Sequence, residues 1–162
     1  MISAYNLGVP RNPDNPWYEQ QLFNPDGFEW IDEGLGGFLA TRPEYVNRAA
    51  ENLGAQKVPT LRNVDLRPNP EFVKAYAHNG YFKTLKGIVH FYNTRDVLPT
   101  CPDPLFTTEA DALAMNCWPE PEIPENVNTR ELGDFKLSDE DEDAIVAFLK
   151  TLSDGFIPPA AQ

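Results

Sequence analysis

The sequence predicts a mainly α, loop-rich domain. In residues 84–93 and 138–152, apolar side chains recur at the 3.6-residue spacing of an amphipathic helix. Sixteen prolines and ten glycines predict long ordered loops between the helices. No alternation of apolar and polar residues lasts long enough to predict a large sheet. A chain of 162 residues suffices for one domain with a core of its own.

Residues 1–57 are predicted to form an irregular loop region followed by a helix. Prolines prevent a long helix in residues 1–30. The aromatic side chains there are expected to pin the loop onto the core: Trp17, Tyr18, Phe23, Phe28 and Trp30. Residues 31–42 predict a tight turn, because GLGG lacks the spacing of a phosphate-binding loop. Pro43 then suits the first position of a helix that Gly54 ends.

Residues 58–93 are the most unusual stretch. Pro59 pushes Val58 towards an extended conformation and opens a Pro-rich loop. Residues 76–80 (YAHNG) then predict a turn that carries one of the two histidines. The helix predicted over 84–93 collects these residues on one face: Leu85, Ile88, Val89 and Tyr92. Spacing alone makes Tyr92 a core tyrosine whose hydroxyl is hydrogen-bonded.

Residues 94–137 are predicted to be a Pro-rich loop that contains one short helix. Thr108 can cap this helix, which runs through Met115, because Asp111 follows three residues later. In residues 138–155, Ser138 is the expected N-cap of the clearest helix, which Gly155 stops. Its predicted buried face consists of Ile145, Val146, Phe148, Leu149 and Leu152. The acidic run 139–143 lacks the spacing of a calcium loop and indicates a solvated helix start.

Charge and cysteine content narrow the class of protein. The net charge of −12 argues against a nucleic-acid partner and fits a basic redox partner or simple solubility. The sequence has no run of 18 apolar residues, so we expect no membrane span. Its start, MISAYNLG, lacks the features of a signal peptide, which indicates a cytoplasmic chain or a missing N-terminus. Cys101 and Cys117 are either reduced thiols or a disulfide worth about 3 kcal/mol.

Several blocks of sequence resemble a known family. VPTLRNV, AYAHNG and FKTLKGIVHFYN follow one another in residues 58–93, with YNLGVPRNP and DEGLGGF upstream and LSDEDEDAIVAFLKTL downstream. In this order they resemble the C-terminal haem domain of the bacterial di-haem cytochrome c peroxidase and MauG-like family. The resemblance implies a cytochrome c-like fold for residues 1–162, with residues 58–93 in the haem pocket. It also implies export to the periplasm, which favours the disulfide between Cys101 and Cys117.

The resemblance implies roles for residues of the 58–93 stretch. Tyr92 would ligate the haem iron where the peroxidases carry methionine and MauG-like members carry tyrosine. A phenolate stabilises ferric and higher-valent iron, whereas methionine raises the reduction potential. Arg62, Tyr76 and His78 would contact the haem, Arg62 through a propionate. From the residues alone, Arg62 reads as a surface charge and His78 as a loop histidine bonded to backbone.

Two further expectations concern metal ligation. By resemblance, the backbone carbonyls of Val73 and Ala75 would bind the calcium ion that the family holds between its haems. His90 points about 200° round the helix from Tyr92, so the two side chains cannot easily serve one iron. We therefore expect His90 to lie at the surface or to support a ligand.

The sequence departs from the family in one respect. It contains no Cys-x-x-Cys-His, the motif that attaches haem c and supplies its proximal histidine, and Cys101 and Cys117 cannot replace it. In the family this motif lies a short way upstream of the YNLGVP block. We therefore expect an N-terminally truncated piece that alone holds no covalent haem, has no catalytic residue of its own and folds poorly.

The protein that the resemblance implies is a periplasmic di-haem c-type oxidoreductase, which reduces peroxide or oxidises a protein partner through haem. Its electrons would come from a small redox protein or from an aromatic side chain of a protein substrate, and a homodimer is left open. Two alternatives remain. One is a haem-free binding or structural module. The other is a simple electron-transfer cytochrome c domain, against which Tyr92 argues because methionine would be expected there.

Overall fold

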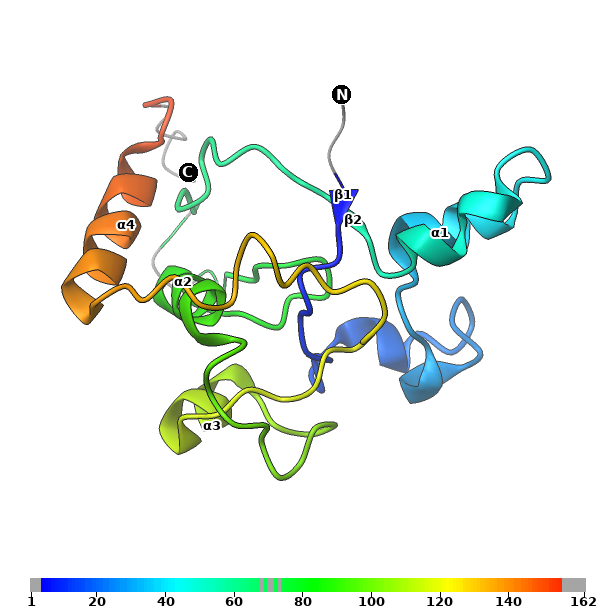
Figure 1. Ribbon diagram of the computed structural model, residues 1–162, viewed down its shortest axis with the longest axis horizontal. Coiled ribbons are helices and arrows are strands. Elements are labelled where there is room, and N and C mark those ends of the chain that lie inside the picture. Colours follow the sequence, from blue (N-terminus) through cyan, green and yellow to red (C-terminus); the bar gives the residue numbers. More distant parts are fainter. Residues whose placement is uncertain (1–3, 68, 70–71, 73, 156–162) are drawn as a thin grey trace, which may run out of the picture.

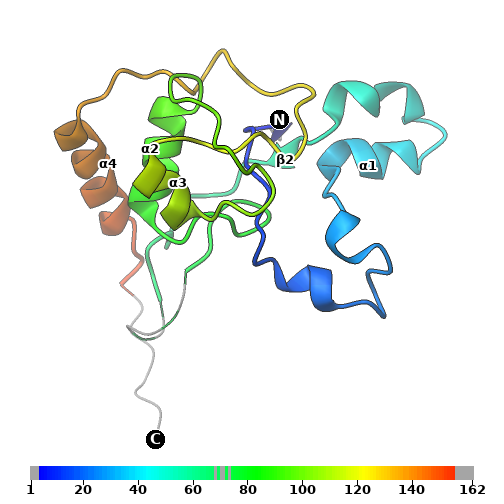
Figure 2. The ribbon, with the colours of Figure 1, turned by 90° about the horizontal axis from the view of Figure 1, so that it is seen from below.

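The computed structural model describes residues 4–67, 69, 72 and 74–155. Within them the chain is mainly α, and its helices are α1 (Gly34–Ala40), α2 (Leu85–Thr94), α3 (Glu109–Met115) and α4 (Asp139–Thr151). Short 3-10 turns span Pro16–Glu19, Gly27–Glu29, Val46–Arg48 and Ala50–Asn52. Two strands, β1 (Ala4–Tyr5) and β2 (Gln56–Lys57), pair antiparallel. Figures 1 and 2 show α2, α3 and α4 at one end of the molecule and α1 with the N-terminal loops at the other.

Helix α2 begins where the sequence predicted it. The Thr84 side chain accepts a hydrogen bond from the Gly87 amide at 2.9 Å, which satisfies one free donor of the first turn. The buried carboxylate of Glu109, the first residue of α3, accepts from the Lys83 amide at 2.6 Å and from the Thr84 hydroxyl at 3.0 Å. A negative charge at this end also suits the helix dipole. The start of α2 is thereby fixed to α3.

The predicted caps of α3 and α4 are confirmed. Thr108 with Asp111, and Ser138 with Asp141, each form a reciprocal capping box. The predicted buried face of α4 is wrong, because Phe148 is 60% exposed and the remaining apolar residues of that face are exposed or half-buried. Helix α4 instead packs on α2 through the charged residues of its first turns. No helix of the described residues is long and apolar enough to cross a membrane.

The region around α1 differs from the prediction. Residues 34–40 form a helix rather than a tight turn, since the Leu35 amide bonds the Ala55 carbonyl and Gly36 packs closely on Leu53. A Cβ on Gly36 would lie 2.5 Å from Leu53 Cα, so a larger residue cannot occupy this site without a shift. The helix predicted from Pro43 to Gly54 is wrong. It is two 3-10 turns, because Tyr45 leaves the helical region with φ −125° and ψ 0°.

The N-terminal aromatic residues differ in how far they are buried. Tyr18 is buried and packs edge-on against Phe28, whose ring stacks on Phe106 at 5.3 Å. The Arg11 guanidinium lies 4.2 Å from the Phe28 ring centroid. Phe23, by contrast, is 70% exposed, so the prediction that it pins the loop onto the core is wrong.

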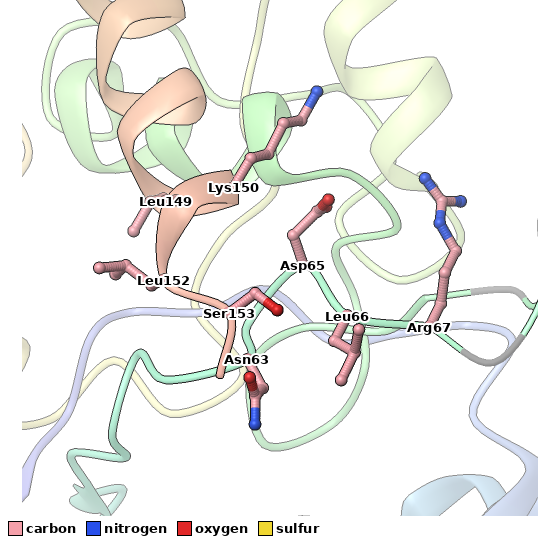
Figure 3. Close-up of a pocket in the computed structure, with 8 residues that line it drawn as sticks. All are labelled: Asn63, Asp65, Leu66, Arg67, Leu149, Lys150, Leu152 and Ser153. Atoms are coloured by element: carbon pink, nitrogen blue, oxygen red, sulfur yellow. The ribbon is translucent and has the colours of Figure 1, made fainter. Parts of the chain in front are cut away.

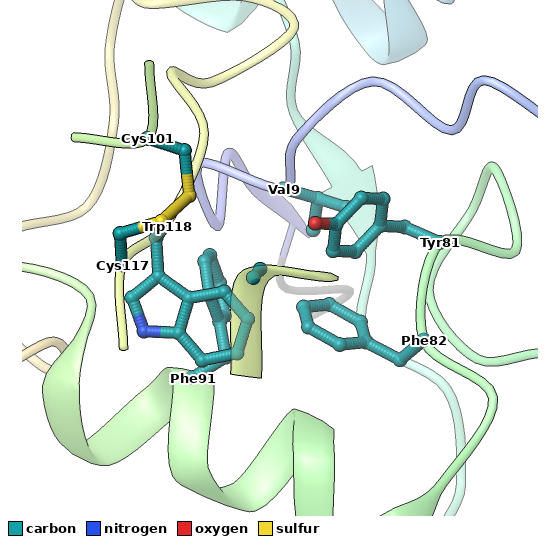
Figure 4. Packing of buried hydrophobic residues seen from close by; sticks show 8 residues of the cluster. Val9, Tyr81, Phe82, Phe91, Cys101, Cys117 and Trp118 are labelled. Atoms are coloured by element: carbon teal, nitrogen blue, oxygen red, sulfur yellow. A yellow bond between two sulfur atoms is a disulfide. The ribbon is translucent and has the colours of Figure 1, made fainter. Parts of the chain in front are cut away.

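The core brings together four segments that are distant in sequence. Phe91 of α2 lies at its centre, 5.2 Å from the Trp118 ring and 5.0 Å from the Phe82 ring (Figure 4). The buried members are Val9, Tyr81, Phe82, Phe91, Cys101, Ala112, Cys117 and Trp118. A disulfide joins Cys101 to Cys117, the pairing that the resemblance favoured. It ties the two ends of the loop that carries α3 to the core.

Buried polar side chains hold the loops to this core. The Arg95 guanidinium, at the end of α2, donates to the Leu7 carbonyl at 2.7 Å and to the Asn128 carbonyl at 2.9 Å. Asn6 donates to the carbonyls of Ile123 at 2.9 Å and Glu125 at 2.7 Å. Loop carbonyls that have no strand or helix partner are satisfied in this way.

Removing the disulfide should destabilise the fold. Replacing Cys101 and Cys117 together by Ala is expected to lower the free energy of unfolding by about 3 kcal/mol, since the unfolded chain gains the entropy of an open loop. Urea denaturation with and without a thiol reductant measures this. The reductant should weaken the wild type and leave the double variant unchanged. Equal stability of the wild type and the double variant in the absence of reductant would contradict the prediction.

Candidate cofactor-binding site

Tyr92 lies on α2 directly after the central core residue. Its ring centroid is 6.3 Å from that of Phe91, and the side chain packs half-buried against the core. Burial raises the pKa of the Tyr92 phenol above its ordinary value. Among the described residues none hydrogen-bonds its hydroxyl, although spacing predicted such a partner. Its oxygen is therefore available to bind a cofactor.

Tyr76 presents a second phenol of this kind. Its amide donates to the Phe82 carbonyl at 2.8 Å, and the ring packs against the core. The hydroxyl is buried and has no hydrogen-bond partner within the described part of the chain. Burial, and then the charge of Asp65, raise the pKa of Tyr76. A buried hydroxyl without a partner costs roughly 1–3 kcal/mol, which a bound acceptor would offset.

The loop of residues 58–67 is fastened to the end of α4. The Asn63 amide donates to the Leu152 carbonyl at 2.6 Å, and the Asn63 side chain donates to Asp154 at 2.9 Å. A cavity of about 300 Å³ lies between them (Figure 3), lined by Asn63, Asp65, Leu66, Arg67, Leu149, Lys150, Leu152 and Ser153. Its walls combine leucines with two cations, Arg67 and Lys150, which sequence reasoning did not single out.

The other predicted site residues of this stretch are not brought together with the phenols by any contact. Arg62 is 69% exposed, and its Nε lies 3.8 Å from the Asp154 carboxylate. Ala75 is exposed, and Val73 lies outside the described residues. Among the described residues no group of three or more histidine, cysteine or acidic side chains is placed to hold a metal ion. The calcium site stays a prediction.

His78 pairs with a buried carboxylate that sequence reasoning missed. Its Nε2 lies 3.2 Å from Glu122 Oε2, and the Glu122 side chain is only 3% exposed. Asn79 donates to the same oxygen at 3.3 Å and to the Pro10 carbonyl at 2.8 Å. Forty-four positions separate His78 from Glu122, so only the fold could reveal the pair.

His90 likewise pairs with a buried carboxylate, that of Glu142 on α4. Its Nδ1 lies 2.9 Å from Oε1 of Glu142, to which Asn93 donates at 2.7 Å. The Glu142 side chain is 2% exposed, so the expectation that the run 139–143 is solvated is wrong for this residue. Burial acts to raise the pKa of Glu142, but the hydrogen bonds from Asn93 and His90 hold it below its ordinary value. His90 thus joins the two helices.

The fold and these sites define a mainly α, disulfide-linked domain in which two phenols that no described residue hydrogen-bonds adjoin an aromatic core. No family model matches the chain. It is 35% identical over 151 residues to methylamine utilization protein MauG of Paracoccus denitrificans, and 29% identical over 100 residues to cytochrome-c peroxidase IdrP1 of Denitromonas iodatirespirans. The matches cover 93% and 55% of this chain, but 33% and 23% of the two relatives. The chain is thus related to the MauG-like and di-haem cytochrome c peroxidase family.

The α2–α4 contact should weaken in acid. Glu142→Gln is expected to lower the free energy of unfolding by about 2 kcal/mol at neutral pH, because hydrogen bonds to a charged group are weakened. The folded-state pKa of Glu142 lies below the ordinary value of 4.5. Its contribution is therefore complete above the unfolded pKa and is lost as pH falls through the folded pKa.

Urea denaturation of both proteins from neutral pH into acid tests this, and the two stability curves should converge in acid. Glu140→Gln, an exposed change of the same charge on the same turn, is the control. A constant gap between wild type and Glu142→Gln at every pH would rule out the assigned role.

Proposed function

We propose that this chain is the cytochrome c-like part of a periplasmic di-haem c-type oxidoreductase in which Tyr92 ligates one haem iron. The observation that carries the proposal is the half-buried Tyr92 phenol, which has a raised pKa and no hydrogen-bond partner among the described residues. It stands on the helix that anchors the core, at the position where the family resemblance requires an axial ligand. The relationship to MauG and to a cytochrome-c peroxidase supports the same class of chemistry.

The residues present fit a haem. The buried Tyr76 hydroxyl and the phenol of the half-buried Tyr92 have no hydrogen-bond partner among the described residues. Apolar side chains on α4 and the 58–67 loop are also exposed, as expected next to a large apolar cofactor: Leu61, Leu66, Ile145 and Phe148. Cys101 and Cys117 are consumed in the disulfide, so they cannot form thioethers to a haem vinyl group. Covalent attachment would therefore require a Cys-x-x-Cys-His outside this sequence.

The protonation of Tyr92 gives its proposed role a physical basis. Burial raises the pKa of a phenol that already titrates near 10, so Tyr92 alone keeps its proton at neutral pH. A ferric ion beside the oxygen would reverse this, because a metal cation is the largest charge in its site and favours the anionic ligand. A bound haem would supply one-electron redox chemistry, and the phenolate would favour its oxidised states.

The other residues would orient the cofactor. We assign Arg62 to a haem propionate, which requires that it exchange its exposed contact with Asp154 for the propionate. Tyr76 would donate its free hydroxyl, and His78 would lie at the haem edge. Calcium bound by the carbonyls of Val73 and Ala75 remains part of the proposal.

The whole protein would reduce peroxide or oxidise a protein partner. A net charge of −12 favours association with a basic partner such as a small redox protein, because complementary charge speeds encounter. The disulfide agrees with an oxidising compartment such as the periplasm. The resemblance leaves a homodimer open.

Haem attachment is the first test. The chain is expressed with the cytochrome c maturation machinery, both as given and extended upstream through the next Cys-x-x-Cys-His, and a pyridine haemochrome spectrum is recorded. We expect c-type haem in the extended protein alone. Haem bound to the short chain would point to His78 or His90 as a ligand and would reopen the assignment of Tyr92.

Ligation by Tyr92 is tested in the haem-loaded, extended protein. Tyr92→Met should raise the reduction potential of one haem, on the order of 100 mV within the roughly 0.8 V span that axial ligands cover. Tyr45→Met, which changes an exposed tyrosine, should leave both potentials unchanged. An unaltered potential and absorption spectrum in Tyr92→Met would exclude Tyr92 as the ligand.

A further inference from the structure

A second cavity, which we call the α3 cavity, is formed by α3 and the loop before it. Its volume is about 360 Å³, and it is lined by Asp103, Phe106, Thr107, Asp111, Ala114 and Met115. The last three of these residues are three and four positions apart, so they share one face of α3. The cavity shares no lining residue with the one between the 58–67 loop and α4, and Figure 1 shows α3 and α4 on different sides of α2.

The apolar part of the α3 cavity is exposed. Phe106 is 60% exposed, and Leu105 and Met115 are exposed as well. Phe106 stacks on Phe28 with an angle of 6° between the ring planes, so one face of its ring is covered and the other is open. Exposed apolar side chains that gather around a cavity are typical of a surface that binds another molecule.

Two carboxylates line the same cavity, and each is fixed through one oxygen. Oδ1 of Asp103 accepts from the amides of Leu105 and Phe106, both at 3.1 Å. Oδ2 of Asp111 accepts from the Thr108 hydroxyl at 2.6 Å, within the capping box of α3. No described residue hydrogen-bonds the second oxygen of either carboxylate or forms an ion pair with it. The cavity therefore combines fixed negative charge with acceptor oxygens that remain open.

A third carboxylate adds to the negative charge of this part of the fold. Glu109 is buried and accepts from the Lys83 amide and the Thr84 hydroxyl, and among the described residues no cation pairs with it. Burial, and then the charges of Glu109 and Asp111, raise the pKa of Tyr81. The field of these carboxylates thus reaches a core residue, and it would attract a cation to the α3 cavity.

A guanidinium group matches both the apolar and the acidic part of the cavity. It is planar and stacks on aromatic rings such as Phe106, and its N–H groups form a fork that binds carboxylates. The methylenes of an arginine side chain would lie along Met115, because long cationic side chains bury their stems on apolar surface. The same fold already contains such a contact, since the Arg11 guanidinium lies 4.2 Å from the Phe28 ring centroid. A metal ion fits less well, because no group of three or more ligating side chains exists among the described residues.

We propose that the α3 cavity is a docking site for a basic partner protein, and that an arginine side chain of this partner contacts Asp103, Asp111 and the open face of Phe106. The proposal deepens the proposed function and rests on it for the kind of partner. The net charge of −12 favours a protein over a free small cation, because attraction over the whole surface acts on many charges of a basic protein at once. Leu105 extends the surface beyond the cavity, so residues that flank the arginine would also be in contact.

Binding is measured by NMR on the full chain of 162 residues, labelled with ¹⁵N. The probe is an acetylated and amidated tripeptide, leucine–arginine–leucine, and its control carries citrulline, which has the shape of arginine without the charge. We expect the arginine peptide to shift the amide signals of residues 103–106 and 111–115, and the citrulline peptide to leave them in place. Equal shifts with both peptides, or shifts confined to other residues, would overturn the proposal.

Variants of matched charge separate a local site from the charge of the whole chain. Asp103→Asn combined with Asp111→Asn keeps the oxygens that accept from the loop and the cap and removes both charges. It should weaken binding of the arginine peptide by about fivefold or more. Glu44→Gln combined with Glu140→Gln makes the same change of net charge at exposed positions outside the cavity, and should keep the wild-type affinity. Equal weakening in the two double variants would refute a local site.

Phe106→Leu tests the aromatic contact and leaves both carboxylates unchanged. Because the side chain is largely exposed, this variant decides the question even if the double Asn variant does not fold. We expect binding of the arginine peptide to weaken by about threefold, since leucine offers no aromatic face to a cation. Unchanged affinity in Phe106→Leu would contradict the proposed position of the guanidinium.

Free arginine amide distinguishes a protein partner from a small cation. We expect it to bind about threefold more weakly than the tripeptide, because it lacks the flanking leucines that would pack on Leu105 and Met115. Equal affinity would mean that the cavity takes a small organic cation, and would overturn the docking site. These measurements need no haem. Failure of the extended protein to attach haem would therefore refute the proposed function without changing their outcome.

Discussion

The structure depends on satisfying the backbone of long loops that have few strands or helices to bond. Arg95 shows how this is done, because one guanidinium at the end of α2 binds carbonyls from residues 7, 128 and 132. Asn6 does the same for residues 123 and 125. Each of these buried side chains replaces the regular hydrogen bonds of a ladder. The N-terminal and C-terminal loops are therefore held against each other by polar contacts as much as by apolar packing.

Helix α2 contacts the aromatic core, α3 and α4. One side places Phe91 in the aromatic core, and another binds α4 through Glu142. Its start is tied to α3 by Glu109. Tyr92 is consequently carried by a helix that is held by the core, by α3 and by α4, so its oxygen can be held at a defined place. A ligand that must meet a metal ion needs such a support.

Two buried carboxylates, Glu142 and Glu122, are each paired with a histidine, but the two pairs lie in different parts of the fold. Glu142 and His90 lie between two helices, where the pair holds α4 to α2. Glu122 and His78 lie between loops, and one carboxylate oxygen is left over. Each carboxylate keeps one buried oxygen without a hydrogen-bond partner among the described residues, but Oε2 of Glu142 lies 3.3 Å from the Lys86 ammonium.

Local chemistry in the sequence determined α2, α3 and α4, because caps such as Thr108 with Asp111 and a 3.6-residue repeat act over a few neighbouring residues. The family resemblance singled out Tyr92, Tyr76 and the two cysteines, while the residues alone made Tyr92 an ordinary core tyrosine. The tertiary structure decided those features that depend on residues distant in sequence. Helix α1 forms because Gly36 packs on Leu53, and Glu142 is buried because His90 and Asn93 face it across 49 or more positions. Such partners leave no local pattern, so only the folded chain could show them.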